Sequence, residues 1–337
     1  MLNLTSHQPV VMPAGSPPVL TVVVDTEEEF DWNQPFSRSN TSTRSIAAQP
    51  LVHQRVFDKH GVVPTYVIDW PVANDPEAVK VLKSLMNEGR CEIGAHLHPW
   101  VSPPYDEEVN TRNSYAGNLP QQLEYRKLEL LTQAIASNFG KPPIMFKAGR
   151  YGVGPHTAQT IAQLGYLIDA SVVPYTDMRS DAGPDFSKHG VHPYWFKVHN
   201  QNLLELPATA GYAGTLHQHG RWLYPWLQKS MAKHLRLAGV AARTGLLERV
   251  KLSPEGYRTQ ELIRLTRCLY AQGCRFFGLT YHSPSLSPGN TPYVKSADDL
   301  QVFLSVLDQY VSFFLNEFKG KTLSSSEYLK LMFNQSV

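Results

Sequence analysis

Two pairs of side chains in this sequence have the types and the spacing of a metal site with an acid–base group beside it. Asp25 and Glu27 are two residues apart and directly follow an all-apolar run, and His96 and His98 have the same spacing. Alternate side chains of an extended segment point to the same side, so each pair shares a face. Two imidazoles and one carboxylate hold a divalent ion and leave positions open for water and substrate. An acidic turn at a strand end and a pair of surface histidines are the simpler alternatives.

Three further polar residues follow apolar runs. Arg150 lies among glycines that let the backbone approach a ligand closely, and its guanidinium has the shape to clamp a carboxylate such as Asp25. Asp169 ends another apolar run, and His282 ends the last one. A histidine at that place is a candidate general acid because its pKa lies near neutrality. An exposed arginine at a helix start and a capping histidine are the alternatives. The sequence has neither a P-loop nor the nucleophile elbow of a serine hydrolase.

The elements that must position these residues follow an α/β pattern. Apolar runs alternate with helical patterns, which is typical of βα units and a mostly parallel sheet. The predicted strands are 19–24, 62–68, 91–95, 144–148, 166–173, 203–207 and 276–281. The predicted helices are 45–59, 75–88, 118–139, 155–164, 296–318 and a short one after Ser324, with an interrupted helical stretch over 221–273. Asp25, His96, Arg150, Asp169 and His282 all fall at the C-terminal ends of strands, where parallel α/β folds build their sites.

Composition narrows the class of protein. The chain has 31 Lys and Arg against 29 Asp and Glu, so we expect no broad attraction to nucleic acid or to an anionic membrane. Its three cysteines have no paired spacing, which argues against a disulfide framework. The first 18 residues lack the pattern of a secretory signal, and no apolar run approaches a membrane span. We therefore expect a cytoplasmic protein, with a flexible arm over 1–18 and a single domain over 19–337 that carries a helical elaboration at about 215–273.

Taken in order, the polar strand ends resemble the five motifs of the polysaccharide deacetylase family, also called the NodB-homology family or carbohydrate esterase family four. The resemblance spans about residues 19 to 286 and is greatest to the WalW-like branch. It implies a distorted (β/α) barrel of about seven parallel strands.

The resemblance also assigns roles to residues. In the first motif, Val24-Asp25-Thr26-Glu27, Asp25 matches the catalytic base, and Glu27 takes the place of the metal-binding carboxylate, because Thr26 replaces the usual second Asp. The second motif is compressed to His96-Leu97-His98-Pro99 and supplies two metal ligands. The third survives as Arg150, which holds the base, with Gly152 and Val153 in place of Pro and Tyr. The fourth supplies Asp169 to orient the histidine of the fifth, His282, which follows Leu279 at one residue more than the usual spacing.

The implied function is metal-dependent hydrolysis of an N-acetyl group from a sugar or glycan precursor of lipopolysaccharide or exopolysaccharide synthesis. One divalent ion, with Zn²⁺ as the first choice, is the expected cofactor, and a backbone amide near Val153 is the expected donor to the oxyanion. The aromatic side chains of Trp70, Trp100, Tyr105 and Trp222 are candidates for stacking on sugar rings. Two alternatives remain open: a non-catalytic carbohydrate-binding protein on a decayed barrel, and a hydrolase of a non-sugar amide.

Overall fold

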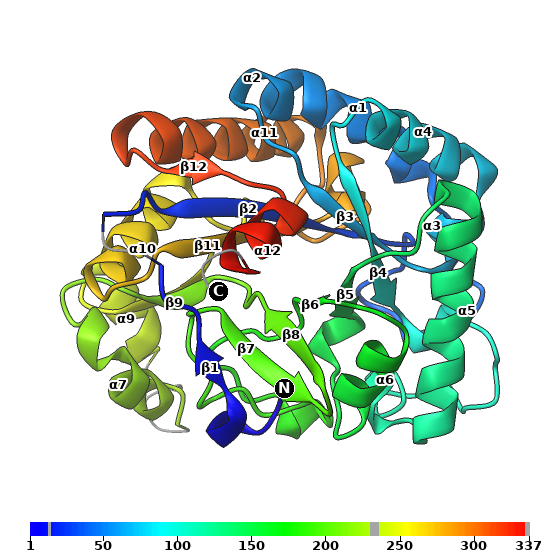
Figure 1. Ribbon diagram of the computed structural model, residues 1–337. Coiled ribbons are helices and arrows are strands. Elements are labelled where there is room, and N and C mark those ends of the chain that lie inside the picture. Colours follow the sequence, from blue (N-terminus) through cyan, green and yellow to red (C-terminus); the bar gives the residue numbers. More distant parts are fainter. Residues whose placement is uncertain (13–14, 230–235, 334–337) are drawn as a thin grey trace.

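Parallel strands curl into a half-barrel with helices on its outer side (Figure 1). The structure is a computed structural model that describes residues 1–12, 15–229 and 236–333. Within these ranges, seven neighbouring strands run parallel in the order β8 (Gln201–Glu205), β6 (Ile168–Asp169), β5 (Met145–Ala148), β4 (Glu92–Leu97), β3 (Thr65–Ile68), β2 (Val19–Thr26) and β11 (Phe276–His282). The prediction of a distorted parallel barrel of about seven strands is confirmed.

Short strands extend this sheet and form a second one. The antiparallel strands β7 (Tyr194–Val198) and β1 (Gln8–Pro9) continue the edge beside β8, and β12 (Lys321–Thr322) pairs with the start of β2. The separate pair is β9 (Ala210–Ala213) with β10 (Glu248–Lys251).

Helices follow most of the parallel strands. A continuous helical segment is made of η2 (Arg44–Ala48), α1 (Gln49–Val52), η3 (His53–Phe57) and α2 (Asp58–His60), and it ends at Gly61 in the left-handed conformation. The other helices are α3 (Trp70–Asn74), α4 (Pro76–Asn87), α5 (Gln121–Phe139), α6 (Thr157–Gln163), α7 (Gly220–Leu227), α9 (Leu237–Arg243), α10 (Thr259–Ala271), α11 (Ala297–Ser312) continued by η10 (Phe313–Glu317), and α12 (Ser325–Phe333). Single 3-10 turns are η1 (Leu4–Ser6), η4 (Pro99–Val101), η5 (Ala116–Asn118), η6 (Gly149–Tyr151), η7 (Arg179–Asp181), η8 (His217–His219) and η9 (Ser283–Leu286).

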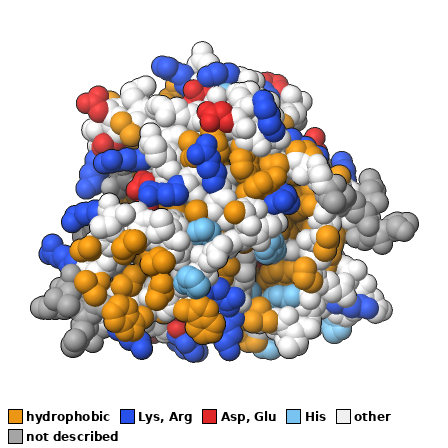
Figure 2. Space-filling model, turned by 90° about the vertical axis from the view of Figure 1, so that its left-hand side faces the viewer, with side chains coloured by type: hydrophobic (Ala, Val, Ile, Leu, Met, Phe, Trp, Pro, Cys, Tyr) orange, Lys and Arg blue, Asp and Glu red, His pale blue; other side chains and the backbone are white. Residues whose placement is uncertain are grey.

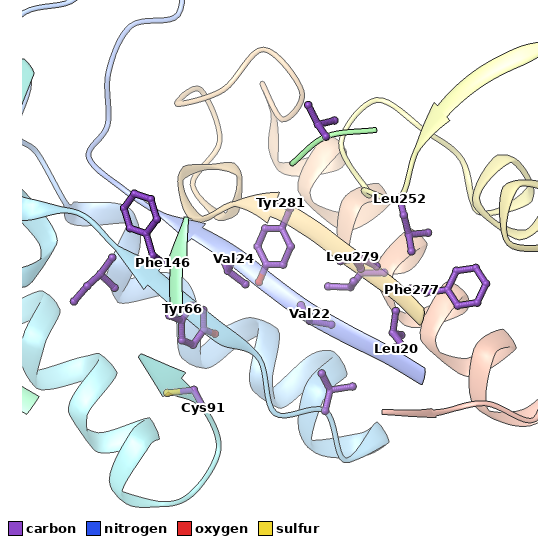
Figure 3. Packing of buried hydrophobic residues seen from close by; sticks show 14 of the residues in the cluster. Leu20, Val22, Val24, Tyr66, Cys91, Phe146, Leu252, Phe277, Leu279 and Tyr281 are labelled. Carbon is purple, nitrogen blue, oxygen red and sulfur yellow. The ribbon is translucent and has the colours of Figure 1, made fainter. Parts of the chain in front are cut away.

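Alternation along the strands decides which side chains enter the barrel. Leu20, Val22 and Val24 of β2 belong to the core that packs against the outer helices (Figure 3), whereas Val19 and Val23 belong to the smaller interior core. The period of two continues to Asp25, which therefore points into the barrel. The other strands follow the same rule, and the interior positions at their C-terminal ends are His96 of β4, Lys147 of β5 and Thr280 and His282 of β11.

The last helix closes the opposite end of the half-barrel. Tyr328, Leu329 and Met332 of α12 pack with Val19 and Phe276, which begin their strands, in the interior core. This apolar packing leaves the C-terminal ends of the strands as the open end of the barrel.

Two predicted segments differ from the structure. The stretch 221–273 is not helical throughout, because β10 pairs antiparallel with β9 and buries Val250. The arm predicted to be flexible over 1–18 is folded over part of its length, since Gln8 and Pro9 pair with β7 and the ring of His7 stacks on that of Tyr194 at 3.8 Å. Residues 13 and 14 of this arm and 230–235 of the elaboration lie outside the described residues.

The elaboration exposes large apolar side chains. Figure 2 looks onto the side of the molecule that carries α7 and α9, and its lower part shows hydrophobic side chains gathered beside Lys and Arg. Trp222 and Trp226, one turn apart on α7, are 81% and 54% exposed. None of the described helices has the length and the hydropathy that a membrane span requires.

Candidate active site

A pocket of about 470 Å³ opens at the C-terminal ends of β2, β4, β5 and β11. It is lined by acidic, basic, imidazole and aromatic side chains together. The lining residues include Asp25, Glu27, Trp32, His96, His98, Lys147, Arg150, Tyr151, Lys251 and His282. The strand parity described above therefore gathers residues from distant parts of the chain around one cavity.

The three predicted metal ligands meet at the floor of this pocket. The Oε2 atom of Glu27 lies 3.5 Å from Nε2 of His96 and 3.5 Å from Nε2 of His98. One ligand atom from each of the three residues lies within 4.8 Å of the others, and all three side chains are buried. The spacing leaves a point between the three atoms from which a single ion could contact each of them.

Hydrogen bonds behind the two histidines aim their Nε2 atoms at Glu27. Nδ1 of His96 lies 3.0 Å from the carbonyl oxygen of Lys147, and Nδ1 of His98 lies 2.8 Å from the carboxylate of Glu28. Both acceptors require the proton on Nδ1, which leaves Nε2 with a free lone pair. Metal-binding histidines in proteins are oriented in this way by a carbonyl or a carboxylate.

Two further contacts fix the ring of His98. Hydrogen bonds hold Glu28, which orients this ring, and Gly149 leaves the space that the ring occupies. The indole of Trp100 donates to Glu28 at 2.8 Å, and the Glu28 backbone amide donates to Asp69 at 2.8 Å. A Cβ atom at Gly149 would lie 2.3 Å from Cδ2 of His98. Part of the glycine run after β5 is therefore required by the packing of the second histidine.

The environment of Glu27 fits a bound cation. Its Oε1 atom is buried and has no hydrogen-bond partner among the described residues. Burial raises the pKa of Glu27 well above its ordinary value, and the charges of Glu28 and Asp25 raise it further. A buried carboxylate beside two other acids is costly unless a positive charge compensates it, and two imidazole nitrogens with one carboxylate are donors that Zn²⁺ accepts.

Asp25 is paired with a lysine rather than with the arginine that the sequence suggested. Nζ of Lys147 donates to Oδ1 of Asp25 at 2.5 Å and to the hydroxyl of Thr280 at 3.0 Å. Burial by itself would raise the pKa of Asp25, but the attraction of Lys147, with His96 and His282, lowers it below its ordinary range. Asp25 is thus an ionised carboxylate whose second oxygen, Oδ2, is directed to the pocket side, 3.8 Å from Nε2 of His282.

The expectation that Arg150 clamps Asp25 is wrong in this geometry. The guanidinium of Arg150 pairs with Asp181, donates to the hydroxyl of Ser114 at 2.5 Å and lies over the ring of Tyr115 at 4.1 Å. Arg150 follows β5, so it lies beyond the interior position that Lys147 occupies within the strand. It still lines the pocket, where it forms part of the wall.

His282 is oriented by Glu255. Nδ1 of His282 lies 2.9 Å from Oε2 of Glu255, and the His282 backbone amide donates to Oε1 of the same carboxylate at 3.0 Å. Ser285 donates to Glu255 at 2.6 Å. Burial would raise the pKa of Glu255, but these contacts with His282 and Ser285 lower it, so the carboxylate stays ionised and holds the ring with Nε2 toward Asp25.

Asp169 therefore does not orient the histidine, contrary to the role that the resemblance implied. It is fully buried on β6, where it accepts a hydrogen bond from Ser171 at 2.6 Å and lies in register with Glu205 of the neighbouring strand β8. Burial raises the pKa of Asp169, and burial together with the charge of Asp169 raises that of Glu205. Asp169 and Glu205 thus form a pair of buried acids at the ends of the neighbouring strands β6 and β8.

The backbone amide of Val153 is also engaged elsewhere. It donates to the carbonyl oxygen of Tyr151 at 2.9 Å, so it does not present a free N–H to the pocket. Of the aromatic residues suggested for sugar stacking, Trp100 lines the pocket but is buried against Glu28. Trp32, which the sequence analysis did not select, also lines the pocket. Its ring makes an edge-on contact with the ring of His282, with 5.2 Å between the ring centres.

The known structures that resemble this chain share its fold. No protein-family model matches the sequence, and no curated protein matches it. A putative polysaccharide deacetylase from Mycobacterium smegmatis superposes with a TM-score of 0.57 at 18% identity over 99% of this chain and 96% of its own. A probable polysaccharide deacetylase from Pseudomonas aeruginosa PAO1 gives 0.52 at 13% identity over 94% and 91%. The Puue allantoinase gives 0.51 at 14% identity over 91% and 87%.

Proposed function

We propose that this chain, which has the fold of the polysaccharide deacetylases, is a metal-dependent hydrolase that removes the acetyl group from an N-acetylated sugar. The observation that carries the proposal is that the cluster of Glu27, His96 and His98 lines the same pocket as Asp25 and His282, whose Oδ2 and Nε2 atoms lie 3.8 Å apart. A metal site and an acid–base pair in one pocket are what hydrolysis of an unactivated amide requires.

Glu27, His96 and His98 would hold one divalent ion, for which Zn²⁺ is the first candidate. When bound, such an ion acts as a Lewis acid that polarises the amide carbonyl and lowers the pKa of a water molecule. The hydrogen bonds from the histidine Nδ1 atoms to the Lys147 carbonyl and to Glu28 hold the two rings ready for that role.

The chain's own groups move the protons. Asp25, kept ionised by Lys147, takes a proton from the water that attacks the carbonyl carbon. As the C–N bond breaks, His282 gives a proton from Nε2 to the leaving amine, while Glu255 stabilises the charged ring through Nδ1. The products are acetate and the free amino sugar, and the proton balance between Asp25 and His282 is restored through solvent.

We further propose that the substrate is a precursor unit of surface polysaccharide that is handled in the cytoplasm, rather than a finished polymer. The pocket of about 470 Å³ is walled by aromatic side chains, including Trp32, Phe36 and Tyr293, and it matches a small number of sugar units better than an extended chain. The sugar and its carrier are left to experiment.

Metal analysis of variants tests the ligand assignment. His96→Ala combined with His98→Ala is expected to remove most of the bound divalent ion, because two of the three ligands are lost. Glu27→Ala should also lose the ion, whereas Asp25→Asn should keep it, since Asp25 is bound by Lys147 instead. Elemental analysis of the purified proteins gives the answer, with the exposed His156→Ala as the matched control. Full occupancy in the double histidine variant would contradict the assignment.

A further inference from the structure

One tyrosine of the pocket accepts a hydrogen bond from a lysine that also lines the pocket. Nζ of Lys251 donates to the phenol oxygen of Tyr151 at 2.6 Å and lies 5.2 Å from the centre of the same ring. Both residues line the pocket that contains Asp25, Glu27 and His282. Among the described residues, Lys251 makes no ion pair, so its charge is directed at the phenol and at the pocket.

The hydrogen bond leaves the tyrosine's own proton free. Because Lys251 donates and the phenol oxygen accepts, the O–H of Tyr151 is not used in this contact. Burial raises the pKa of Tyr151 to about 12, against the lowering effect of Lys147, so the phenol remains a donor through the neutral range. The ring of Tyr151 also lies 5.3 Å from Nζ of Lys147, the residue that holds Asp25, so the phenol lies close to the proposed base.

The backbone around Tyr151 is constrained so that the side chain enters the pocket. Arg150 and Tyr151 have φ angles of 54° and 58°, in the left-handed region that residues other than glycine seldom adopt. Such backbone persists where the surrounding structure over-determines it, and it is concentrated at functional sites. The same turn uses the Val153 amide for the Tyr151 carbonyl, so the backbone donor that the sequence suggested for the oxyanion is taken.

We propose that Tyr151 is a catalytic residue that stabilises the oxyanion of the tetrahedral intermediate through its O–H, and that Lys251 is a positioning residue that holds and polarises this phenol. The inference rests on the proposed deacetylase function. As the attacking water adds to the carbonyl carbon, negative charge develops on the carbonyl oxygen, and a preorganised donor beside it lowers the barrier. Lys251 keeps its proton throughout. Its hydrogen bond to the phenol oxygen polarises the O–H of Tyr151 and so strengthens the bond from this O–H to the oxyanion.

Kinetics of metal-loaded variants tests the proposal. Tyr151→Phe should lower kcat by about 10² to 10³, the loss that follows removal of one oxyanion donor, and should leave KM and metal content near those of the wild type. Lys251→Met should lower kcat less, and Lys251→Arg should restore much of it. The double variant of Tyr151→Phe and Lys251→Met should lose no more than Tyr151→Phe alone, because the two groups act as a unit. Tyr270→Phe, which removes a phenol hydroxyl outside the pocket, is the control.

A binding measurement separates this inference from the function on which it rests. Calorimetry would compare a planar N-acetyl sugar with its tetrahedral phosphonamidate analogue. The wild type should prefer the analogue, and Tyr151→Phe should lose most of that preference while its melting temperature stays unchanged. A wild type that releases acetate, together with a fully active Tyr151→Phe, would overturn the role of Tyr151 and leave the deacetylase intact. A wild type that neither releases acetate nor binds the analogue would overturn both.

Discussion

At the scale of single residues, the two ring nitrogens of His282 have different partners, and in the proposed mechanism Nδ1 orients the ring while Nε2 gives the proton. Glu255 occupies Nδ1 through an ionised carboxylate, and Nε2 faces Asp25 at 3.8 Å. Lys147 does for Asp25 what Glu255 does for His282, since it fixes one oxygen and leaves the other toward the pocket. The proposed base and the proposed acid thus lie side by side, and each is held by a buried side chain, Asp25 by Lys147 and His282 by Glu255.

This arrangement distinguishes the two carboxylates that compete for the role of orienting His282. His282→Ala should lower kcat by about 10² to 10⁴, the usual loss for a general acid. Glu255→Gln should lower kcat by a smaller factor, because the ring stays but loses its charged partner. Asp169→Asn should retain nearly full kcat, since Asp169 contacts Ser171 and Glu205 instead.

Acetate release under saturating substrate measures all three variants, with metal content as the check that the floor of the pocket is intact. An Asp169→Asn variant as impaired as Glu255→Gln would return the orienting role to Asp169.

The site residues that the sequence predicts are those at the ends of predicted strands. Asp25, Glu27, His96, His98 and His282 lie at strand ends with readable alternation, so the sequence placed them together. Lys147 carried the same signal, because it occupies an interior position between Phe146 and Ala148. Glu255 and Lys251 carried no such signal, because Lys251 ends the short strand β10 and Glu255 lies in the loop between β10 and α10, and tertiary packing brings both to the site.

At the scale of elements, the loop between β4 and α5 walls the pocket and is held by one lysine. Nζ of Lys127 on α5 is buried and donates to the carbonyl oxygens of Pro99, Ser102 and Pro104 at 3.1, 2.5 and 2.6 Å. It also pairs with buried Glu107 at 2.9 Å. One side chain therefore replaces the regular backbone pairing that this long loop lacks.

Removing that lysine should loosen the loop. Lys127→Met removes the donor to three carbonyl oxygens and the nearer cation beside Glu107, which keeps Arg38 at 3.9 Å, and it is expected to lower the free energy of unfolding by about 3–5 kcal/mol. Arg126→Met on the same helix removes an exposed pair with Glu129, so it should cost at most about 1 kcal/mol. Urea unfolding of both variants checks this. Equal midpoints would show that Lys127 does not support the loop.

The sequence predicts the parallel strands and their helices but not the short antiparallel strands. Parallel strands and their helices were visible because each carries its own period of buried residues. The sequence predicts an interrupted helical stretch over 221–273 although β10 lies inside it, because a four-residue strand with Val250 as its buried centre is too short to show a period of two. The strands β7 and β9 are not predicted from the sequence either. Their pairing depends on partners that the local sequence does not reveal.

At the scale of the whole molecule, the half-barrel has one closed end and one open end. α12 fills the first with apolar side chains, and the pocket occupies the second. The walls of the pocket come from the loop after β4, from the segment of Trp32 and Phe36, and from the loop that contains Tyr293. Under the proposed function, these walls limit the size of the sugar that the pocket admits.

We therefore expect the enzyme to prefer short substrates. The kcat/KM per acetyl group should fall as an N-acetylated oligosaccharide grows beyond a few units, because a long chain must pass the aromatic walls instead of lying in an open groove. A series from the monosaccharide to a chitin-like polymer, with nucleotide-linked sugars included, gives the comparison. A preference for the long polymer would contradict this expectation.

The most direct test of the proposed function is acetate release from a short N-acetylated oligosaccharide by the wild-type protein, followed through chelation and reloading with Zn²⁺. We expect release by the loaded protein, loss of release when the chelator removes the ion, and recovery when the ion is returned. Release that continues at the full rate in protein shown to be metal-free would contradict it. So would a fully loaded protein that releases no acetate from any N-acetylated sugar.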